Sequence, residues 1–208
     1  MHCVIIAGSP EANVKFIAEQ AKNCDYLICA DKGYEYAKAA NLKVDCIIGD
    51  FDSFCGKLPR DCEIIRLDSH KDDTDLLHCI EFALSKGYDK FTVLAATGGR
   101  FDHTFANVSV LMYLSKNGAD GEIISEKEII RYLGVGEYSF CGYKGKTFSL
   151  FPFACDRVQV SYKGAEYQAD ELVLTAESAM GISNVFTDDE AFVKINYGSA
   201  IIIINQYI

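Results

Sequence analysis

The chain has 208 residues, half of them hydrophobic, and a formal net charge of −10 at pH 7. A chain of this size and composition can bury a core, and it forms one large or two small globular domains. Its negative charge argues against a nucleic-acid partner, because affinity for a phosphate backbone depends on many Lys and Arg contacts. No stretch approaches the roughly eighteen uninterrupted apolar residues of a membrane span. The apolar run at residues 3–7 is too short for a signal-peptide core, so we expect a cytoplasmic protein without a membrane segment.

Cysteine and histidine spacing excludes two further classes of protein. The nine cysteines contain no C-x-x-C pair, and several lie inside apolar stretches where cysteine behaves as a small hydrophobe. The four histidines are scattered along the chain. Neither a disulfide framework nor a zinc site is therefore predicted.

The first two thirds of the chain alternates short apolar runs with helix-like segments. Apolar runs that predict buried strands occupy residues 3–8, 26–30, 46–48, 63–67, 91–96 and 122–125. Segments with helical periodicity or composition occupy residues 11–22, 34–40 and 76–86, and a last one extends to residue 117. This alternation predicts an α/β domain with a mostly parallel sheet and helices on both faces.

After about Gly134 the helical periodicity disappears and short strands separated by turn residues replace it. Such strands are expected at residues 147–151, 157–162, 171–175, 191–197 and 200–205. Their composition is typical of a small antiparallel β-sandwich. We therefore expect two domains, at residues 1–134 and 135–208.

A pair of carboxylates follows the third apolar run, which ends at Gly49. Asp50 and Asp52 lie two residues apart at what should be the carboxyl end of a parallel strand, where open α/β sheets bind ligands. Two acids this close repel each other unless they share a cation or a proton, and hard oxygen ligands suit Mg²⁺ with a phosphate. The alternative is a turn in which the aspartates only cap backbone amides. Recurrence of the pattern at Asp31 and at residues 72–75 favours one phosphate and metal site, because the ends of parallel strands share an edge.

Residues 71–75, KDDTD, lie at the next junction between strand and helix. Thr74 or an aspartate can cap the helix there, and a helix N-terminus favours anions. For Asp73 we expect capping alone. For Asp75, on the first helical turn, we expect metal coordination together with Asp50 and Asp52.

A glycine pair follows the fifth apolar run. Gly98 and Gly99 precede Arg100 and a predicted helix, a setting in which exposed amides cradle phosphate and a guanidinium adds bidentate charge. Neither a Walker P-loop nor a G-x-G-x-x-G fingerprint is present, so the ordinary nucleotide-binding classes are not supported. His103, beside Asp102, is either a general base or a helix-start residue that caps or packs.

Four motifs together resemble the thiamine pyrophosphokinase family in order and spacing, over nearly the whole chain. They are GDFDS at residues 49–53, KDDTD at 71–75, TGGRFDH at 97–103 and GISN at 181–184. DKG at residues 31–33 resembles that family's element after its second strand. The resemblance implies a thiamine diphosphokinase that transfers pyrophosphate from ATP to the hydroxyl of thiamine, giving thiamine diphosphate and AMP, with Mg²⁺ required. It also implies a homodimer in which the 135–208 domain binds thiamine and forms the dimer contacts, while the 1–134 domain binds ATP and Mg²⁺.

The resemblance also implies roles for individual residues. Metal ligands would be Asp50, Asp52 and Asp75, which with Arg100 and Asp102 form the catalytic set. The nucleotide and phosphate site would comprise Asp31, Asp72, Thr74, Gly98, Gly99, Arg100 and Asp102. Ser183 and Asn184 would contact the thiamine pyrimidine, whereas Lys71 and Asp73 receive no catalytic role. The eukaryotic branch often places a tryptophan near its thiamine site; this chain has none, and we expect an aromatic such as Phe186 to replace it.

Two other readings explain the same motifs. Aspartate clusters at strand ends also serve other Mg²⁺-dependent phosphotransferases and phosphohydrolases, which release ADP or phosphate instead of AMP. A non-catalytic thiamine or nucleotide sensor would bind the same ligands without turnover. The full set of Asp50, Asp52 and Asp75 argues against a sensor, which has little need of three metal ligands.

Overall fold

The computed structural model describes residues 1–51, 58–68 and 73–207, and these form two compact units, Met1–Glu126 and Lys127–Ile208. The predicted class is confirmed, because the first unit is α/β and the second is built from antiparallel strands. The predicted boundary after residue 134 stays a prediction. Strand β7 (Glu128–Leu133), which that boundary assigned to the first domain, lies within the second unit.

The sheet of the first unit is parallel. Its strands follow the spatial order β6-β5-β1-β2-β3-β4. In chain order they are β1 (His2–Ile6), β2 (Tyr26–Ala30), β3 (Cys46–Gly49), β4 (Glu63–Arg66), β5 (Lys90–Leu94) and β6 (Asp120–Ile124). The reversal of strand order beside β1 places the carboxyl ends of β1, β2 and β5 next to one another, where sheets of this kind bind ligands.

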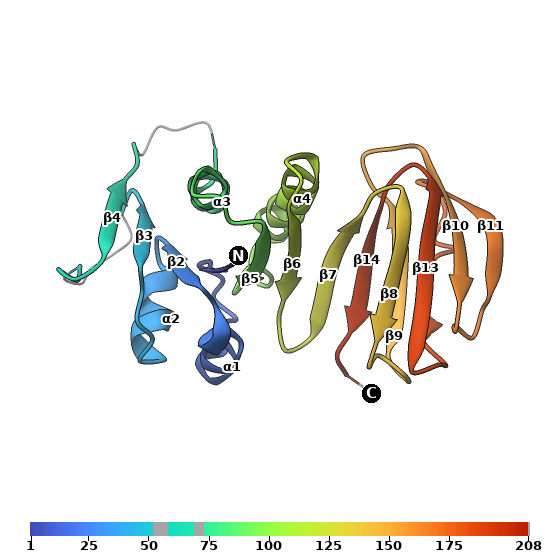
Figure 1. Ribbon diagram of the computed structural model, residues 1–208, viewed down its shortest axis with the longest axis horizontal. Coiled ribbons are helices and arrows are strands. Elements are labelled where there is room, and N and C mark those ends of the chain that lie inside the picture. The colour runs from blue at the N-terminus through green and yellow to red at the C-terminus, as the bar shows by residue number, and fades with distance from the viewer. Residues whose placement is uncertain (52–57, 69–72, 208) are drawn as a thin grey trace. The chain divides into compact units, whose positions relative to one another are not determined.

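Helices cover both faces of this sheet, as predicted (Figure 1). They are α1 (Val14–Gln20), α2 (Gly33–Ala39), α3 (Asp75–Ser85) and α4 (Phe101–Lys116), with a short 3₁₀ turn, η1 (Ala21–Asn23), after α1. Asn13 begins α1 by accepting hydrogen bonds from the amides of Lys15 and Phe16 at 2.9 and 3.2 Å. On one face, Ile17 of α1 and Ala37 of α2 pack with alternate residues of the central strands. None of the helices in the described ranges is long and apolar enough to cross a membrane.

Several cysteines belong to this core. Cys3, Cys29 and Cys79 are fully buried, and burial raises the pKa of each thiol. Burial also raises the pKa of Cys46 to about 12. These thiols stay protonated at neutral pH and act as small apolar side chains, as the sequence predicted.

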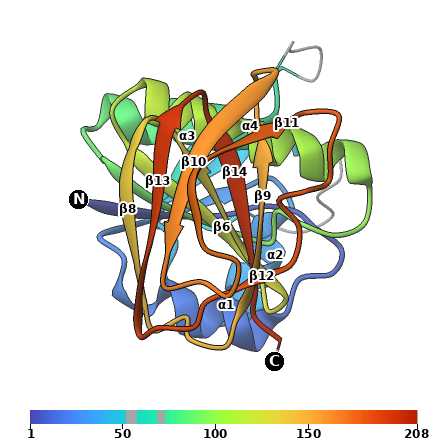
Figure 2. The ribbon, with the colours of Figure 1, turned by 90° about the vertical axis from the view of Figure 1, so that its right-hand side faces the viewer.

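The second unit is a sandwich of two antiparallel sheets, and it faces the viewer in Figure 2. One sheet has the order β12-β9-β14-β7 and the other β11-β10-β13-β8. Besides β7, the strands are β8 (Gly136–Cys141), β9 (Thr147–Pro152), β10 (Arg157–Lys163), β11 (Ala169–Thr175), β12 (Asn184–Val185), β13 (Glu190–Tyr197) and β14 (Ala200–Asn205). Side chains from both sheets, among them Leu150, Val160 and Ile202, form one continuous core.

Candidate active site

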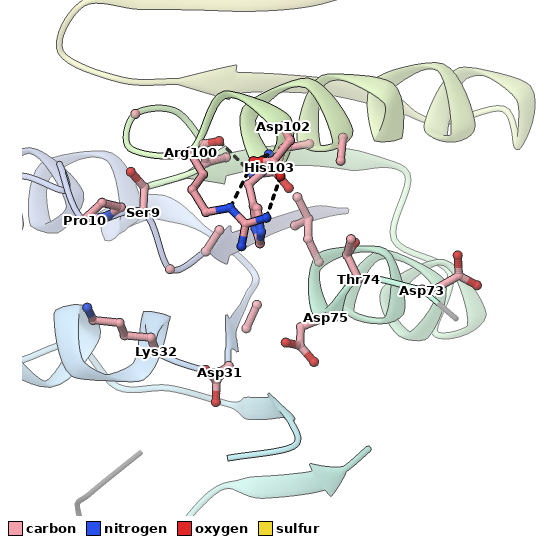
Figure 3. Close-up of a pocket in the computed structure, with 18 of the residues that line it drawn as sticks. Ser9, Pro10, Asp31, Lys32, Asp73, Thr74, Asp75, Arg100, Asp102 and His103 are labelled. Atoms are coloured by element: carbon pink, nitrogen blue, oxygen red, sulfur yellow. Dashed lines mark hydrogen bonds and ion pairs between the residues drawn. The ribbon is translucent and has the colours of Figure 1, made fainter. Parts of the chain in front are cut away.

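A cavity of about 800 Å³ lies in the first unit at the carboxyl ends of its strands. Residues that follow β1, β2, β3 and β5 line it, together with the first residues of α3 and α4 (Figure 3). This is the edge at which the sequence places its polar motifs. Of the predicted site residues, those that line the cavity are Asp31, Asp50, Thr74, Asp75, Gly98, Arg100 and Asp102.

Asp31 is fixed by the close approach of two strand ends. It follows β2 with a left-handed backbone (φ 41°), and its amide donates to the carbonyl of Ile48 at 2.9 Å. A Cβ at Gly49 would lie 3.0 Å from the Cα of Asp31, so a side chain at residue 49 would crowd the neighbouring strand end. The side-chain oxygen Oδ1 of Asp31 is buried. The carboxylate is thus held at the cavity by packing of the backbone around it.

Asp50 follows Gly49 directly and lines the same cavity. The next residue, Phe51, has a left-handed backbone (φ 61°), and the guanidinium of Arg66 lies 5.1 Å from its ring centroid. The predicted ligand Asp52 lies outside the described residues.

The start of α3 brings a third carboxylate to the cavity. Thr74 is the N-cap, since its hydroxyl oxygen accepts from the amide of Leu77 at 3.3 Å. Asp75 is the first helical residue, and Figure 3 shows its side chain directed toward the side on which Asp31 lies. Thr74 therefore performs the capping that we expected of Asp73, which instead lines the cavity. The predicted site residue Asp72 lies outside the described residues.

The chemistry of these donors fits Mg²⁺. Asp31, Asp50 and Asp75 supply hard carboxylate oxygens, and Mg²⁺ is usually held by one or two carboxylates with substrate phosphates and water completing its shell. Among the described residues, no three His, Cys, Asp or Glu side chains are close enough to hold a metal ion by themselves. The arrangement suits a cation that arrives with a phosphate ligand better than a metal cage made only of protein.

Gly98 and Arg100 line the opposite side of the cavity, and Gly99, which lies between them in the sequence, is not among its lining residues. Gly98 and Gly99 have positive φ (96° and 69°), and Arg100, in extended conformation, is the N-cap of α4. The guanidinium Nε of Arg100 donates to Oδ1 of Asp102 at 3.1 Å, and Nη2 donates to Oδ2. These hydrogen bonds lower the pKa of the Asp102 carboxyl and raise the pKa of Arg100. Both groups remain charged at neutral pH, and both are exposed to solvent.

His103 and two residues that the sequence analysis passed over complete the cavity lining. His103 is exposed and its amide donates to Asp102 Oδ1 at 3.0 Å, so of the alternatives left open for this residue, packing in the core is excluded. Ser9 and Lys32 also line the cavity. Ser9 lies in the turn after β1 and Lys32 in the turn after β2. A polar residue just after a strand is the sequence signal by which both could have been found. Among the described lining residues, Lys32 is cationic as well as Arg100 (Figure 3).

The predicted thiamine contacts lie in the second unit and differ in exposure. Ser183 is exposed, with a left-handed backbone (φ 59°), and its amide donates to the hydroxyl of Ser149 at 3.1 Å. Asn184 is only 6% exposed. Its Oδ1 accepts from the amide of Tyr167 at 3.0 Å and its Nδ2 donates to the carbonyl of Tyr167 at 2.8 Å. Asn184 thus clamps the backbone of Tyr167, whose own side chain is 66% exposed.

Phe186 does not have the exposure that a stacking platform requires. It is 1% exposed, and its ring stacks on Phe148 with centroids 4.3 Å apart and on Phe140 at 5.4 Å. The expectation that Phe186 replaces the missing tryptophan is therefore wrong, because this ring belongs to the sandwich core. Tyr167 is the exposed aromatic side chain beside Asn184.

Comparison with known proteins matches both units to one family. Residues 17–122 match the thiamin pyrophosphokinase catalytic domain, and residues 132–202 match the thiamin pyrophosphokinase vitamin B1 binding domain. The thiamine pyrophosphokinase of Bacillus subtilis is 28% identical over 186 residues, covering 86% of this chain and 87% of that protein. Thiamin pyrophosphokinase 1 of Caenorhabditis elegans is 22% identical, covering 92% and 84%.

Solved structures share the fold. The crystal structure of the Bacillus subtilis thiamine pyrophosphokinase aligns with a TM-score of 0.87 at 23% identity over 100% of both chains. That of the yeast enzyme aligns with a TM-score of 0.82 at 14% identity, covering 98% of this chain and 86% of the yeast chain. With one family matched over most of the sequence, this chain belongs to the thiamin pyrophosphokinase family.

Proposed function

We propose that the cavity of the first unit is the site at which this enzyme transfers pyrophosphate from ATP to thiamine, the reaction of its family. The observation that carries the proposal is the convergence of Asp31, Asp50, Asp75 and Arg100, from four separate segments, on one cavity. In the reaction, the hydroxyl oxygen of thiamine bonds to the β-phosphorus of ATP. The bond from that phosphorus to the oxygen bridging it to the α-phosphate breaks, AMP leaves with the electron pair, and the hydroxyl proton is released.

The carboxylate wall would hold the metal. Asp50 and Asp75 are the proposed Mg²⁺ ligands, with Asp52 as a third. The cation, when bound, neutralises charge on the triphosphate and helps to align it. The protein itself positions the carboxylates, because Gly49 fixes the backbone just before Asp50 and the N-cap Thr74 fixes it just before Asp75. Accurate positioning accounts for much of the acceleration in reactions of this type.

The opposite wall would hold the nucleotide. We assign the triphosphate to Gly98, Gly99 and Arg100, because amides at the start of a helix and a guanidinium both favour phosphate oxygens. Lys32 adds a cationic donor on the same cavity. Asp31, Asp72, Thr74 and Asp102 complete the proposed nucleotide site.

Thiamine recognition is proposed for the second unit, whose match to the vitamin B1 binding domain supports it. Ser183 is exposed and is proposed to contact the ligand directly. Asn184, whose amide is used on Tyr167, is proposed to act by holding Tyr167 in place. The phenol ring of Tyr167 offers a flat, electron-rich surface, which suits a ligand with an aromatic pyrimidine and a cationic thiazolium.

A homodimer is also part of the proposal. Met180, Ile182 and Tyr167, large apolar side chains near Ser183, are each more than half exposed. Exposed apolar side chains of this kind mark ligand or subunit contacts. A second copy of the chain would bring such a surface to the cavity of its partner, so that the two sites are shared.

The eight cysteines of the described ranges are free thiols, which supports a cytoplasmic location.

One assay tests the proposed reaction. Purified protein is incubated with ATP, Mg²⁺ and thiamine, and the products are separated. Equal amounts of AMP and thiamine diphosphate are expected. Release of ADP or free phosphate would instead indicate another phosphotransferase or a phosphohydrolase, and ligand binding without products would indicate a sensor.

A further inference from the structure

An acidic side chain from the first loop of the chain lies on the glycine turn to which we assign phosphate. The carboxylate oxygen Oε1 of Glu11 accepts a hydrogen bond from the backbone amide of Gly99 at 3.1 Å. Two further bonds hold the same loop against this turn, from Ser9 N to Ala95 O at 2.9 Å and from Ser9 Oγ to Thr97 O. The contact joins segments 88 positions apart in the sequence.

The two glycines are shaped to receive this loop. A Cβ at Gly98 would lie 2.8 Å from Cδ and 2.9 Å from Cβ of Glu11, which is closer than carbon atoms approach. A Cβ at Gly99 would lie 2.7 Å from Cγ of Pro10. The side chain of Glu11 therefore extends along the turn and covers it, and the missing side chains at residues 98 and 99 make the space.

The carboxylate of Glu11 occupies an amide of the turn to which we assign phosphate. Amides that precede a helix bind anions through their N–H groups, and a carboxylate and a phosphate compete for such donors. The second donor of this wall is engaged in the same way, because the guanidinium of Arg100 is bonded to Asp102. The chain thus covers two of its proposed phosphate-binding donors with two of its own carboxylates.

We propose that Glu11 is an internal competitor of the ATP phosphates, which occupies the Gly99 amide until the triphosphate displaces it. The inference rests on the proposed function, because it requires that the phosphates bind at this turn. Because the phosphates must displace the carboxylate before they can bind this amide, Glu11 lowers the affinity of the protein for ATP. Removing the charge of Glu11 should therefore tighten ATP binding. If Glu11 instead supported the structure of the turn, its removal would weaken ATP binding.

The test compares Glu11→Gln and Glu11→Ala with Glu19→Gln, a control that removes the same charge from an exposed position on α1. Binding of ATP with Mg²⁺ is measured by calorimetry in the absence of thiamine, and KM is measured for both substrates. Both Glu11 variants should bind ATP about three- to tenfold more tightly than the wild type, the size expected for loss of an exposed charged hydrogen bond. The KM for thiamine should not change.

Two results would overturn the inference. ATP affinity of Glu11→Gln no higher than that of Glu19→Gln would show that the carboxylate does not compete with phosphate. Weaker binding by both Glu11 variants would show that Glu11 supports the turn. Failure of the proposed function is distinguishable from either result, because the wild-type chain would then yield no AMP and thiamine diphosphate in the product assay, whatever its affinity for ATP.

Discussion

Asp75 brings a negative charge to a cavity that also contains the carboxylates of Asp31 and Asp50. If this charge binds Mg²⁺, Asp75→Asn should lower kcat/KM by on the order of a hundredfold, since each 1.4 kcal/mol or so of transition-state stabilisation is tenfold in rate. Asparagine has nearly the same shape, so the thermal midpoint should change little. Steady-state rates at several Mg²⁺ concentrations provide the measurement.

A matched control for Asp75→Asn is Glu81→Gln, which removes a charge from the same helix outside the cavity. That variant should keep wild-type rates. Activity of Asp75→Asn close to wild type at saturating Mg²⁺ would contradict the metal assignment.

Arg100 is held by Asp102 through two parallel hydrogen bonds, a geometry that only a planar guanidinium offers. The same fork can bridge two phosphate oxygens, and an ammonium cannot. Arg100→Lys should therefore raise the KM for ATP by about tenfold while the KM for thiamine stays constant. Arg60→Lys, at an exposed position outside the cavity, is the control. An equal loss of thiamine affinity would mean that Arg100 has a structural role.

At the scale of elements, contacts between β12 and the segment before β11 place the side chain of Asn184 on the backbone of Tyr167. Ala165 bridges to Phe186, and Asn184 bonds to both backbone groups of Tyr167, so the two segments run together. If Tyr167 contacts thiamine, Tyr167→Ala should raise the KM for thiamine by about tenfold, the size expected for loss of a ring that meets a cation. The KM for ATP should stay constant. Tyr197→Ala, which removes an equally exposed tyrosine from the opposite end of the β10–β13 ladder, should behave as the wild type.

A double-mutant cycle then separates direct from indirect action of Asn184. If Asn184 acts only through Tyr167, Asn184→Ala should raise the KM for thiamine, and adding it to Tyr167→Ala should raise that KM no further. Additive increases would indicate that Asn184 touches the ligand itself. Thermal unfolding of each variant monitors the loss of the two buried hydrogen bonds, which costs about 1–3 kcal/mol.

The sequence predicted most elements because their patterns are local. The parallel strands are apolar runs stopped by polar or glycine residues, β9, β10 and β13 alternate in sequence, and β14 is another apolar run. Strands β7 and β8 were missed for physical reasons. In β7 the buried residues Ile130 and Leu133 are three apart, a spacing that hides the alternation of a strand. In β8, an edge strand, only the half-buried Tyr138 and the buried Phe140 carry the apolar alternation, so the pattern is too short to stand out.

The site shows the same limit. Asp31, Asp50 and Asp75 were predictable because each stands where a strand ends or a helix begins, which is a local signal. The sequence limited the N-cap of α3 to Thr74 or a neighbouring aspartate but did not identify which residue it is. That choice depends on one hydrogen bond, from the amide of Leu77 to Thr74. The contacts of Glu11 with Gly99 and of Asn184 with Tyr167 join segments distant in the sequence, and packing alone reveals them.

At the scale of the whole molecule, each unit has its own core, and the proposed functions divide between the units. The first has the phosphate and metal cavity, and the second has Ser183 and Tyr167. A reaction between ATP and thiamine requires both sets of residues in one site. In a two-fold symmetric dimer, the set from one chain can complete the set from its partner, which creates two equivalent sites.

Refolding two damaged chains together tests this arrangement. An Asp75→Asn chain, damaged in the cavity, is mixed in equal amounts with a Tyr167→Ala chain, damaged in the second unit, and activity is measured at thiamine well below KM. If sites are shared between subunits, every mixed dimer has one site with both lesions and one with neither. Random pairing makes half of the dimers mixed, so activity should return to roughly a quarter of the wild-type level. If each subunit instead builds its own site, no site is restored, and the mixture shows only the average of the two variants while mass spectrometry still detects mixed dimers.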